Sequence, residues 1–312
     1  MKSVLLIVDY FGRWPAWIDI FLRSCTHNPS IDWLIHTDCP LPALRPDNVR
    51  FVRLSFDDYC RQVSERLDLQ FSPYLREHSK VPIPLYANLC DLRPCYADLY
   101  AQAIAGYDYF GWCDIDLVFG NLRRYLTPGV PERSVVTFSS DLCSGHFTLL
   151  KNDAHATRIY RDIPQWRQRI QGRQGRTPWE DCLDEAWMSR LCSPNPRFRE
   201  QALQAGVTLD VVDRHRHNNA FLREWVTPFI PWDWVEHERV HPEVWYWRAG
   251  SVRNWRDGER EFPYLHFMNF KEHRCVAKPL CELQATWGQR SAVAATALTA
   301  EVFASTARAS LD

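Results

Sequence analysis

Asp114 and Asp116 stand two positions apart in the segment GYDYFGWCDIDLVFGNLRRYL. Residues at this spacing on an extended strand point to the same side, so the two carboxylates would lie close together. They would repel each other unless a cation lay between them. Carboxylate oxygens suit Mg²⁺ or Mn²⁺, and substrate phosphates can fill the remaining coordination positions. The pair predicts a divalent-metal site, and the alternative interpretation is a solvated loop after a strand.

The sequence around the pair favours the metal site. An aromatic and apolar run precedes the two acids, and a second apolar run at 117–119 follows them. Acidic side chains between two runs that are expected to be buried are costly unless they have a partner. A metal held there would stabilise the charge that builds up on a leaving diphosphate.

The elements that must position this pair alternate along the first half of the chain. Strands are expected at 3–8, 33–36, 49–54, 109–113, 134–138 and 146–150, and helices at 17–25, 57–67 and 97–105. This alternation is typical of an α/β fold with right-handed crossovers. Ligands of such sheets bind beyond the carboxyl ends of the strands. The polar residues at these ends are Asp9, Tyr10, Thr37, Asp38, Asp114 and Asp116.

The second half is less regular. A basic helix is expected at 157–170, a further helix from 178 through 191, and a final strand at 264–270. The basic helix is either a solvated face or a surface that contacts anionic lipid. The Trp-rich stretch 225–255 is either a platform for sugar rings or ordinary packing. The Ala-rich tail 281–312 is expected to be helical.

Composition and charge limit the classes of protein. The chain has 312 residues and a formal net charge of −1, which gives no global attraction to nucleic acid. Its 11 cysteines are odd in number and contain no CxxC pair, so we expect reduced thiols in a cytosolic protein. The first apolar run, 4–8, is too short for a signal peptide or a membrane span. We therefore expect a soluble, cytoplasmic protein.

Several stretches resemble a bacterial family of GT-A-type glycosyltransferases from surface-polysaccharide gene sets. The matching pieces are DYFGRWPAWIDIFLRSCTHNPSIDWLIHTD, NLCDLRPCYADLY, YFGWCDIDLVFGNL, SGHFTLLKN, CLDEA and YLHFMNFK. They span most of residues 4–271 in the order of the family, and the combination of CDLRP, GWxDxD and SGHF is specific. The tail after about residue 280 lies outside the resemblance.

The resemblance implies a GT-A-like fold, with a Rossmann-like mixed sheet flanked by helices. Residues 1–280 would form one catalytic domain, with a nucleotide-binding half at about 1–120 and an acceptor half at 121–280. Such an enzyme moves a sugar from a nucleotide-sugar donor, by the habit of the fold a UDP-sugar, to a glycan or a lipid-linked acceptor. A lipid-linked acceptor would bring the protein to the inner leaflet of the membrane.

The resemblance also implies donor-binding residues in the first half. Tyr10 and Phe11 would lie beside the base, with core packing as the alternative. Thr37 and Asp38 would meet the base or ribose, and a turn or helix-capping role is equally open for them. Asp91 and Arg93 would also belong to the donor site, where the fork-shaped guanidinium of Arg93 could bind the diphosphate or a donor hydroxyl. The alternative is a structural ion pair between Arg93 and Asp91.

Two later segments could complete the site. Glycogenin-type GT-A enzymes take a third metal ligand from a late histidine and a phosphate contact from a lysine, which His266 and Lys271 would match. The spacing departs from that pattern, because no HxxGxxKP is present. Ser144, Gly145 and His146 precede another strand. Gly145 would let the backbone approach the sugar, and His146 could bond a hydroxyl, unless the three form a tight loop with a core-facing histidine.

Three acids are candidates for the catalytic base. Inverting GT-A enzymes place a carboxylate near this point of the chain to deprotonate the acceptor hydroxyl. We rank Asp184 first, then Glu185 and Asp181. The alternative is that acids at a helix start are favoured by the helix dipole alone. The choice between inversion and retention stays open.

Two other classes compete with a glycosyltransferase. A metal-dependent nucleotidyltransferase or phosphohydrolase could use the same acids, but no GxxxxGK loop or HD-type spacing is present. A non-catalytic carbohydrate-binding protein would suit the 14 tryptophans. It would leave the acids at the strand ends unexplained.

Overall fold

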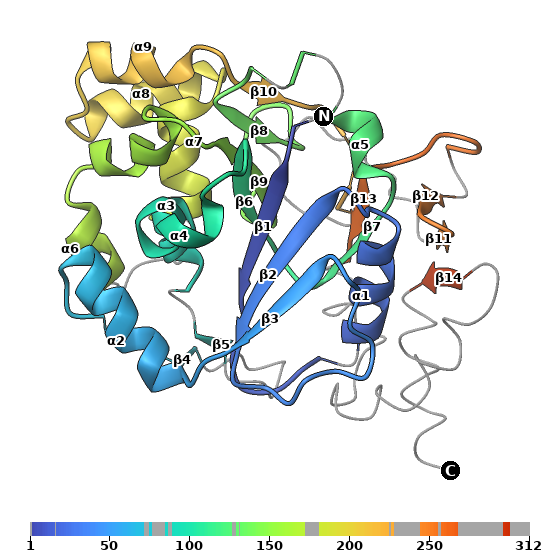
Figure 1. Ribbon diagram of the computed structural model, residues 1–312. Helices are drawn as coiled ribbons and strands as arrows, with labels where there is room; N and C mark the ends of the chain where they lie inside the picture. The colour runs from blue at the N-terminus through green and yellow to red at the C-terminus, as the bar shows by residue number, and fades with distance from the viewer. Residues whose placement is uncertain are drawn as a thin grey trace.

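The computed structural model describes residues 2–15, 17–71, 75–76, 85–86, 89–126, 129–130, 132–171, 181–224, 226–227, 244–254, 257–267 and 296–299. These residues form a mixed α/β structure around one large sheet (Figure 1). The α/β class predicted from the sequence is therefore confirmed.

The large sheet has seven strands in the order β10-β8-β9-β6-β1-β2-β3. β1, β2, β3 and β6 are mutually parallel, whereas β9 runs antiparallel to both β6 and β8, and β10 is parallel to β8. The strands are β1 Val4–Asp9, β2 Ile31–Thr37, β3 Val49–Arg53, β6 Tyr109–Cys113, β8 Val135–Thr137, β9 Phe147–Lys151 and β10 Ala220–Phe221. The sheet is mixed, as expected.

Helices cover both faces of this sheet (Figure 1). Alternate residues of β1 explain the two layers, because successive strand side chains point to opposite faces. Leu5 and Ile7 pack with helices α2–α4 and α6–α9, and Leu6 packs with α1. The α-helices are α1 Ile18–Thr26, α2 Phe56–Leu67, α3 Tyr96–Leu99, α4 Ala101–Ile104, α5 Leu122–Tyr125, α6 Trp166–Gln171, α7 Met188–Cys192, α8 Pro196–Gln204 and α9 Leu209–Arg216.

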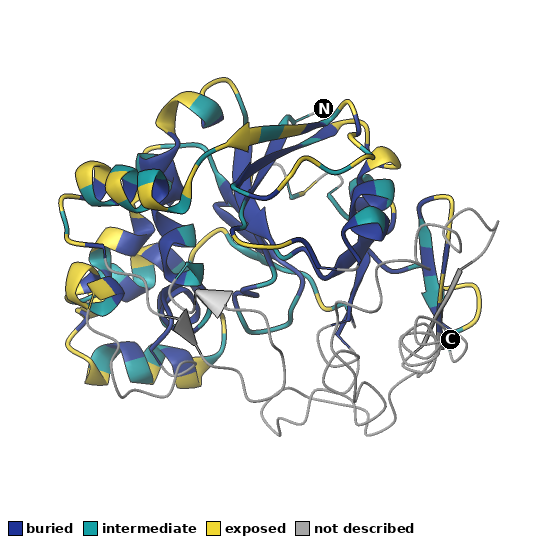
Figure 2. Cartoon of the chain, turned by 90° about the horizontal axis from the view of Figure 1, so that it is seen from below, coloured by how far each residue is buried: buried dark blue, intermediate teal, exposed yellow. Residues whose placement is uncertain are grey.

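The inner strands of the sheet are mostly buried between these layers, whereas the edge strands β3 and β10 are partly exposed. Figure 2 shows much of the sheet dark blue, whereas the outer sides of the surrounding helices carry many exposed residues. In β1 the residues from Val4 through Val8 are all at most 5% exposed. A continuous apolar run is typical of a strand that is covered on both faces.

Three further helical segments and several short strands complete the described structure. The 3₁₀ helices are η1 Cys90–Cys95 and η2 Ala156–Asp162, and η3 Leu183–Trp187 is a π-helix. β7 Leu117–Phe119 pairs with β13 Tyr264–His266, and β4 Leu75–Arg76 pairs with β5 Leu85–Tyr86. β11 Val244–Arg248 lies between β12 Ser251–Asn254 and β14 Thr296–Thr299.

Three expected helices are corrected. The basic helix at 157–170 is two pieces, η2 and α6, because Pro164 cannot donate to a helix and pushes Ile163 to extended backbone, with φ −72° and ψ 120°. The helix at 97–105 breaks at Tyr100, whose φ is −129°. Within the expected helical tail, β14 is a strand, and residues 281–295 and 300–312 lie outside the described residues.

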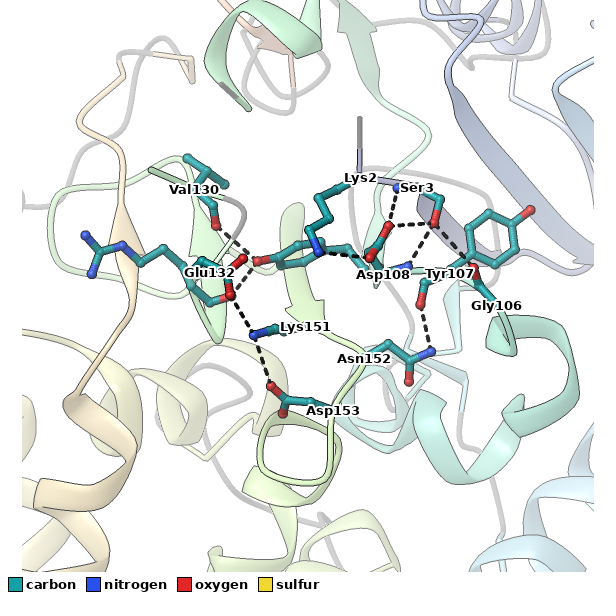
Figure 3. A network of polar contacts seen from close by, with 12 residues as sticks. Lys2, Ser3, Gly106, Tyr107, Asp108, Val130, Glu132, Lys151, Asn152 and Asp153 are labelled. Carbon is teal, nitrogen blue, oxygen red and sulfur yellow. Dashed lines mark hydrogen bonds and ion pairs between the residues drawn. The ribbon is translucent and has the colours of Figure 1, made fainter. Parts of the chain in front are cut away.

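A polar network closes the amino ends of β1 and β6 (Figure 3). The Ser3 N–H donates to Asp108 at 2.8 Å, and the Asp108 N–H donates to the Ser3 hydroxyl at 2.9 Å. Lys2 forms an ion pair with Asp108 at 3.2 Å. The acids of the predicted metal site lie beyond the other end of β6.

The nine cysteines among the described residues are free thiols. No described helix has the length and apolar character needed to cross a membrane.

Candidate metal centre

Asp114, Asp116 and His266 come together as a cluster of metal-ligand type. One ligand atom from each residue lies within 4.8 Å of the other two. The two aspartates occupy the connection from β6 to β7, and His266 ends β13. The antiparallel pairing of Leu117 with His266 brings the late strand to the acids across about half the chain.

Backbone hydrogen bonds fix this arrangement. The Phe267 N–H donates to the Asp116 carbonyl at 3.1 Å, and the His266 N–H donates to the Val226 carbonyl at 2.7 Å. Gly120, just after β7, donates from its N–H to the Pro263 carbonyl at 2.8 Å. The loop that carries the acids is thus held on the strand that carries the histidine.

The imidazole of His266 suits a metal ligand. Its Nδ1 lies 3.0 Å from the hydroxyl oxygen of Thr227, and such a second contact fixes the orientation of a ligating ring. Its buried Nε2 has no hydrogen-bond partner and lies 3.6 Å from Oδ2 of Asp116. A buried nitrogen aimed at a carboxylate, with two hard oxygen donors beside it, fits a divalent ion. Sequence reasoning missed Thr227, for which the sequence has no local signal.

His146 stacks on His266. The two ring centroids are 4.1 Å apart and the planes are inclined by 21°. Burial, and to a lesser degree the neighbouring His266, lowers the pKa of His146 well below its usual value, so the ring is neutral at pH 7. Its buried Nε2 has no hydrogen-bond partner. The half-buried ring of His146 therefore lies directly against His266 of the cluster.

Arg93 joins Asp114 to Asp184 of η3. Its guanidinium forms an ion pair with Asp114, donates to Oδ2 of Asp184 at 3.1 Å and donates to the Gly145 carbonyl. Burial by itself lowers the pKa of Arg93, but the nearby carboxylates, Asp114 foremost, raise it well above its usual value. Arg93 is thus firmly charged, and its partners are these two acids and not Asp91 as in the structural alternative.

Asp91 positions η3 instead. Its Oδ1 accepts the Leu183 N–H at 2.8 Å, at the start of the π-helix, and the residue is fully buried. Free N–H groups at a helix start attract a carboxylate. Short π-helical turns occur often at functional sites. Because η1 carries both Asp91 and Arg93, it holds η3 through two side chains.

Asp184 and Glu185 have different surroundings. Asp184 is 3% exposed and paired with Arg93. Glu185 is partly exposed, and its Oε1 accepts the Gly145 N–H at 2.9 Å. Burial, the adjacent Asp184 and the more distant Asp114 raise the pKa of Glu185 to about 7. A carboxyl group whose pKa is raised toward neutral pH suits acid–base catalysis.

Asp181 is a structural residue. It forms an ion pair with Arg169, and its Oδ1 accepts the Trp187 indole N–H at 3.0 Å. The guanidinium carbons of Arg169 and Arg190 lie 4.3 and 4.5 Å from the Trp187 ring centroid. These contacts support the end of η3. They also show that Arg169 is an interior ion-pair partner and not part of a solvated face.

The two residues expected beside the base differ in exposure. Phe11 is 4% exposed and packs on Phe56 and Tyr59, with centroids 5.1 and 4.7 Å away, which favours the packing alternative. Tyr10 is partly exposed and stacks on Trp14 at 5.2 Å, so an aromatic pair lies at this edge.

Thr37 and Asp38 stabilise turns. The fully buried Thr37 accepts the Cys39 N–H on its hydroxyl oxygen at 3.0 Å, as the turn alternative describes. Oδ1 of Asp38 accepts the Gly12 N–H at 2.6 Å, which joins the loops after β1 and β2. These contacts are compatible with Asp38 facing a ligand.

Ser144 and Gly145 lie just before β9 and make contacts within the protein. Ser144 is 1% exposed, and its N–H donates to the Thr137 hydroxyl at 2.9 Å. A Cβ on Gly145 would lie 2.7 Å from Cγ of Glu185. The close approach that this glycine allows is to the Glu185 side chain, whereas the sequence predicted an approach to a sugar.

Other expected residues fall elsewhere. Lys271 lies outside the described residues, as does most of the Trp-rich stretch 225–255. Within that stretch Trp245 and Trp247 are buried, at 0% and 7% exposure, and the Trp247 N–H donates to the Phe119 carbonyl at 2.9 Å. These two tryptophans are packing residues.

Comparison with known proteins places the chain in a family. Residues 6–281 match the model of a family of unknown function, DUF6625. The protein is therefore a member of that family. Among curated proteins, none matches the chain.

Proposed function

We propose that this protein is a metal-dependent glycosyltransferase with a GT-A-like fold. It transfers a sugar from a nucleotide-sugar donor, expected to be a UDP-sugar, to a hydroxyl of a glycan or lipid-linked acceptor in cell-surface polysaccharide synthesis. The observation that supports this most is the cluster of Asp114, Asp116 and His266 at the carboxyl edge of the sheet, with Arg93 beside it. The expected place of action is the cytoplasmic side of the inner membrane.

The proposed roles follow from the contacts. Asp114, Asp116 and His266 would hold Mn²⁺ or Mg²⁺, and the ion would stabilise charge on the leaving diphosphate. Thr227 keeps Nε2 of His266 directed at Asp116. The nitrogen ligand favours Mn²⁺ over Mg²⁺, which takes oxygen ligands almost throughout.

Glu185 is the proposed base, and this reverses the ranking made from the sequence. Asp184 is buried and neutralised by Arg93, so it has neither access to an acceptor nor a free role as a base. Glu185 is partly exposed and has one oxygen held by Gly145. Its carboxylate would take the proton of the acceptor hydroxyl as that oxygen attacks the anomeric carbon. Position and pKa both suit this task.

A nucleotide-binding assay tests the proposal. Thermal unfolding is measured with UDP, GDP, ADP and CDP, with and without Mn²⁺. Binding to the folded state raises the midpoint, and we expect a rise that needs both the ion and one nucleotide. Asp114→Asn and Asp116→Asn should abolish it, whereas Asp47→Asn, at an exposed position, should not. A rise that survives both site variants would overturn the metal assignment.

The class of enzyme is tested next. Slow release of free sugar from the matching nucleotide-sugar, dependent on Mn²⁺, is the expected activity without acceptor. Release of nucleoside monophosphate instead would identify a phosphohydrolase or nucleotidyltransferase. Metal-independent binding of free glycans without either reaction would identify a carbohydrate-binding protein.

A further inference from the structure

Arg93 and a bound metal would share one carboxylate. Asp114 belongs to the cluster of metal-ligand type, and the same carboxylate forms an ion pair with Arg93. The side chain of Arg93 is 14% exposed and that of Asp184 is 4% exposed. Charges interact more strongly in such partly desolvated surroundings than in water. The affinity for a cation at Asp114 must therefore depend on whether Arg93 is paired with that carboxylate.

Two consequences follow for a divalent ion. The positive charge of Arg93 repels the ion, and its hydrogen bond occupies an oxygen of Asp114. Both effects weaken metal binding while Arg93 stays on Asp114. A nucleoside diphosphate would change this, because its phosphate oxygens offer the guanidinium fork a second anionic partner.

The remaining contacts keep Arg93 at the site when it leaves Asp114. NH1 donates to Asp184 at 3.1 Å and to the Gly145 carbonyl, whereas NH2 donates to Asp114. The NH1 side is thus held by two partners and the NH2 side by one. A small rotation about the held side would direct NH2 away from Asp114, and the charge of Asp184 would remain neutralised.

We propose that Arg93 competes with the metal for Asp114 and binds the diphosphate of the donor, so that the ion binds weakly alone and tightly together with a nucleoside diphosphate. This inference rests on the proposed function. It gives Arg93 a role in coupling the two ligands beyond contact with the donor. By thermodynamic linkage, the factor by which the nucleotide tightens metal binding equals the factor by which the metal tightens nucleotide binding.

The test is Mn²⁺ affinity, measured by the electron paramagnetic resonance signal of the free ion, with and without saturating UDP. In the wild-type protein we expect UDP to tighten Mn²⁺ binding by about tenfold or more. Arg93→Met should bind Mn²⁺ alone several-fold more tightly than the wild type, because the competitor is gone. UDP should tighten Mn²⁺ binding less in this variant than in the wild type. Arg124→Met, at an exposed arginine paired with Glu261, should behave as the wild type.

Arg93→Lys is the second variant, since Arg93→Met leaves Asp184 without its partner and could unfold the protein. A lysine keeps the charge near Asp114 but cannot form a fork onto phosphate. Its affinity for Mn²⁺ alone should stay close to that of the wild type, and the effect of UDP should fall about tenfold.

The outcomes separate the two proposals. If folded Arg93→Met binds Mn²⁺ alone no more tightly than the wild type, or if Arg93→Lys keeps the full effect of UDP, the role of Arg93 is wrong and the proposed function stands. If the wild-type protein binds Mn²⁺ neither alone nor with any nucleoside diphosphate, the proposed function fails, and this inference fails with it.

Discussion

At the scale of single residues, Asp184 and Glu185 are neighbours in the chain, but different contacts surround their carboxyl groups. Asp184 faces inward onto Arg93, and Glu185 faces the Gly145 N–H with part of its surface exposed. The sequence LDEA does not distinguish them. The difference depends on Arg93, which is 91 positions away from Asp184. Arg93 stabilises the carboxylate of Asp184, whereas burial and the neighbouring Asp184 raise the pKa of Glu185.

The pH dependence of stability tests the state of Glu185. Because burial raises its pKa to about 7 in the folded protein from the usual 4.5, the folded state binds the proton more tightly. The contribution of Glu185 to the free energy of unfolding therefore falls as pH rises from about 4.5 to about 7, and it is constant above that. We expect the wild type to lose on the order of 2 kcal/mol relative to Glu185→Gln between pH 5 and pH 8.

Urea unfolding of both proteins at pH 5 and pH 8 measures this difference. Glu200→Gln, at an exposed glutamate, is the matched control and should follow the wild type at both pH values. Equal changes in the wild type and Glu185→Gln would show that this carboxyl group titrates as it does in the unfolded chain.

Thr227 is the residue that orients the histidine. Thr227→Val keeps the shape of the side chain but removes the oxygen 3.0 Å from Nδ1 of His266. Loss of such a partner lowers metal affinity by about 10- to 100-fold. We expect this loss in a Mn²⁺ titration in the presence of UDP. Thr26→Val, at an exposed threonine, should leave the affinity unchanged, and an unchanged affinity in Thr227→Val would remove Thr227 from the site.

At the scale of elements, the π-helix η3 depends on contacts at both of its ends. Asp91 accepts the N–H of Leu183 at its start, and Asp181 accepts the indole N–H of Trp187 at its end. A π-turn has fewer favourable backbone contacts than an α-helix and needs support from its surroundings. The position of Glu185 relative to Gly145 is set by these anchors.

Asp181→Asn separates support of this element from catalysis. The substitution removes the ion pair with Arg169 but keeps an oxygen for Trp187, so we expect a loss of about 1–3 kcal/mol in the free energy of unfolding. Mn²⁺ affinity should change by less than about twofold, because the substitution acts on the contacts with Arg169 and Trp187, which are not members of the metal-ligand cluster. A large loss of metal affinity with unchanged stability would show that Asp181 acts in the site and not only in supporting η3.

Some boundaries of helices and strands can be predicted from the local sequence pattern alone. The strand at 109–113 and the helix ending at Leu67 are as expected, since a continuous apolar run or a strong amphipathic pattern with a Ser55 cap determines them locally. β7 was not expected as a strand, because a three-residue apolar run has no period of its own. It becomes a strand by pairing with β13.

At the scale of the whole molecule, β6 joins the parallel part of the sheet to the antiparallel part. Gly111 lies at its centre, opposite Leu6 on β1 and Leu149 on β9. A Cβ at this position would collide with the Thr148 carbonyl and would lie 2.9 Å from Cα of Leu149. The strand that leads into Asp114 therefore approaches β9 as closely as only a glycine permits.

Gly111→Ala should destabilise the whole sheet. The added methyl must displace backbone of β9, and overpacking of this kind costs about 1–3 kcal/mol or more. We expect a lower midpoint of thermal unfolding, measured by far-ultraviolet circular dichroism, and weaker Mn²⁺ binding, because Asp114 follows β6 directly. A variant as stable as the wild type would mean that β6 and β9 can separate without cost.

The sequence by itself determined the α/β class, most strands of the large sheet and the place of Asp114 and Asp116 at the end of β6. These features depend on apolar periodicity and on residues close together in the chain. Only the tertiary structure decided that His266 meets Asp116, that Thr227 orients it, that Arg93 joins Asp114 to Asp184, and that Asp181 supports a helix. These contacts join residues up to about 150 positions apart, and such pairings follow from how the packed elements meet and leave no periodic trace in the sequence.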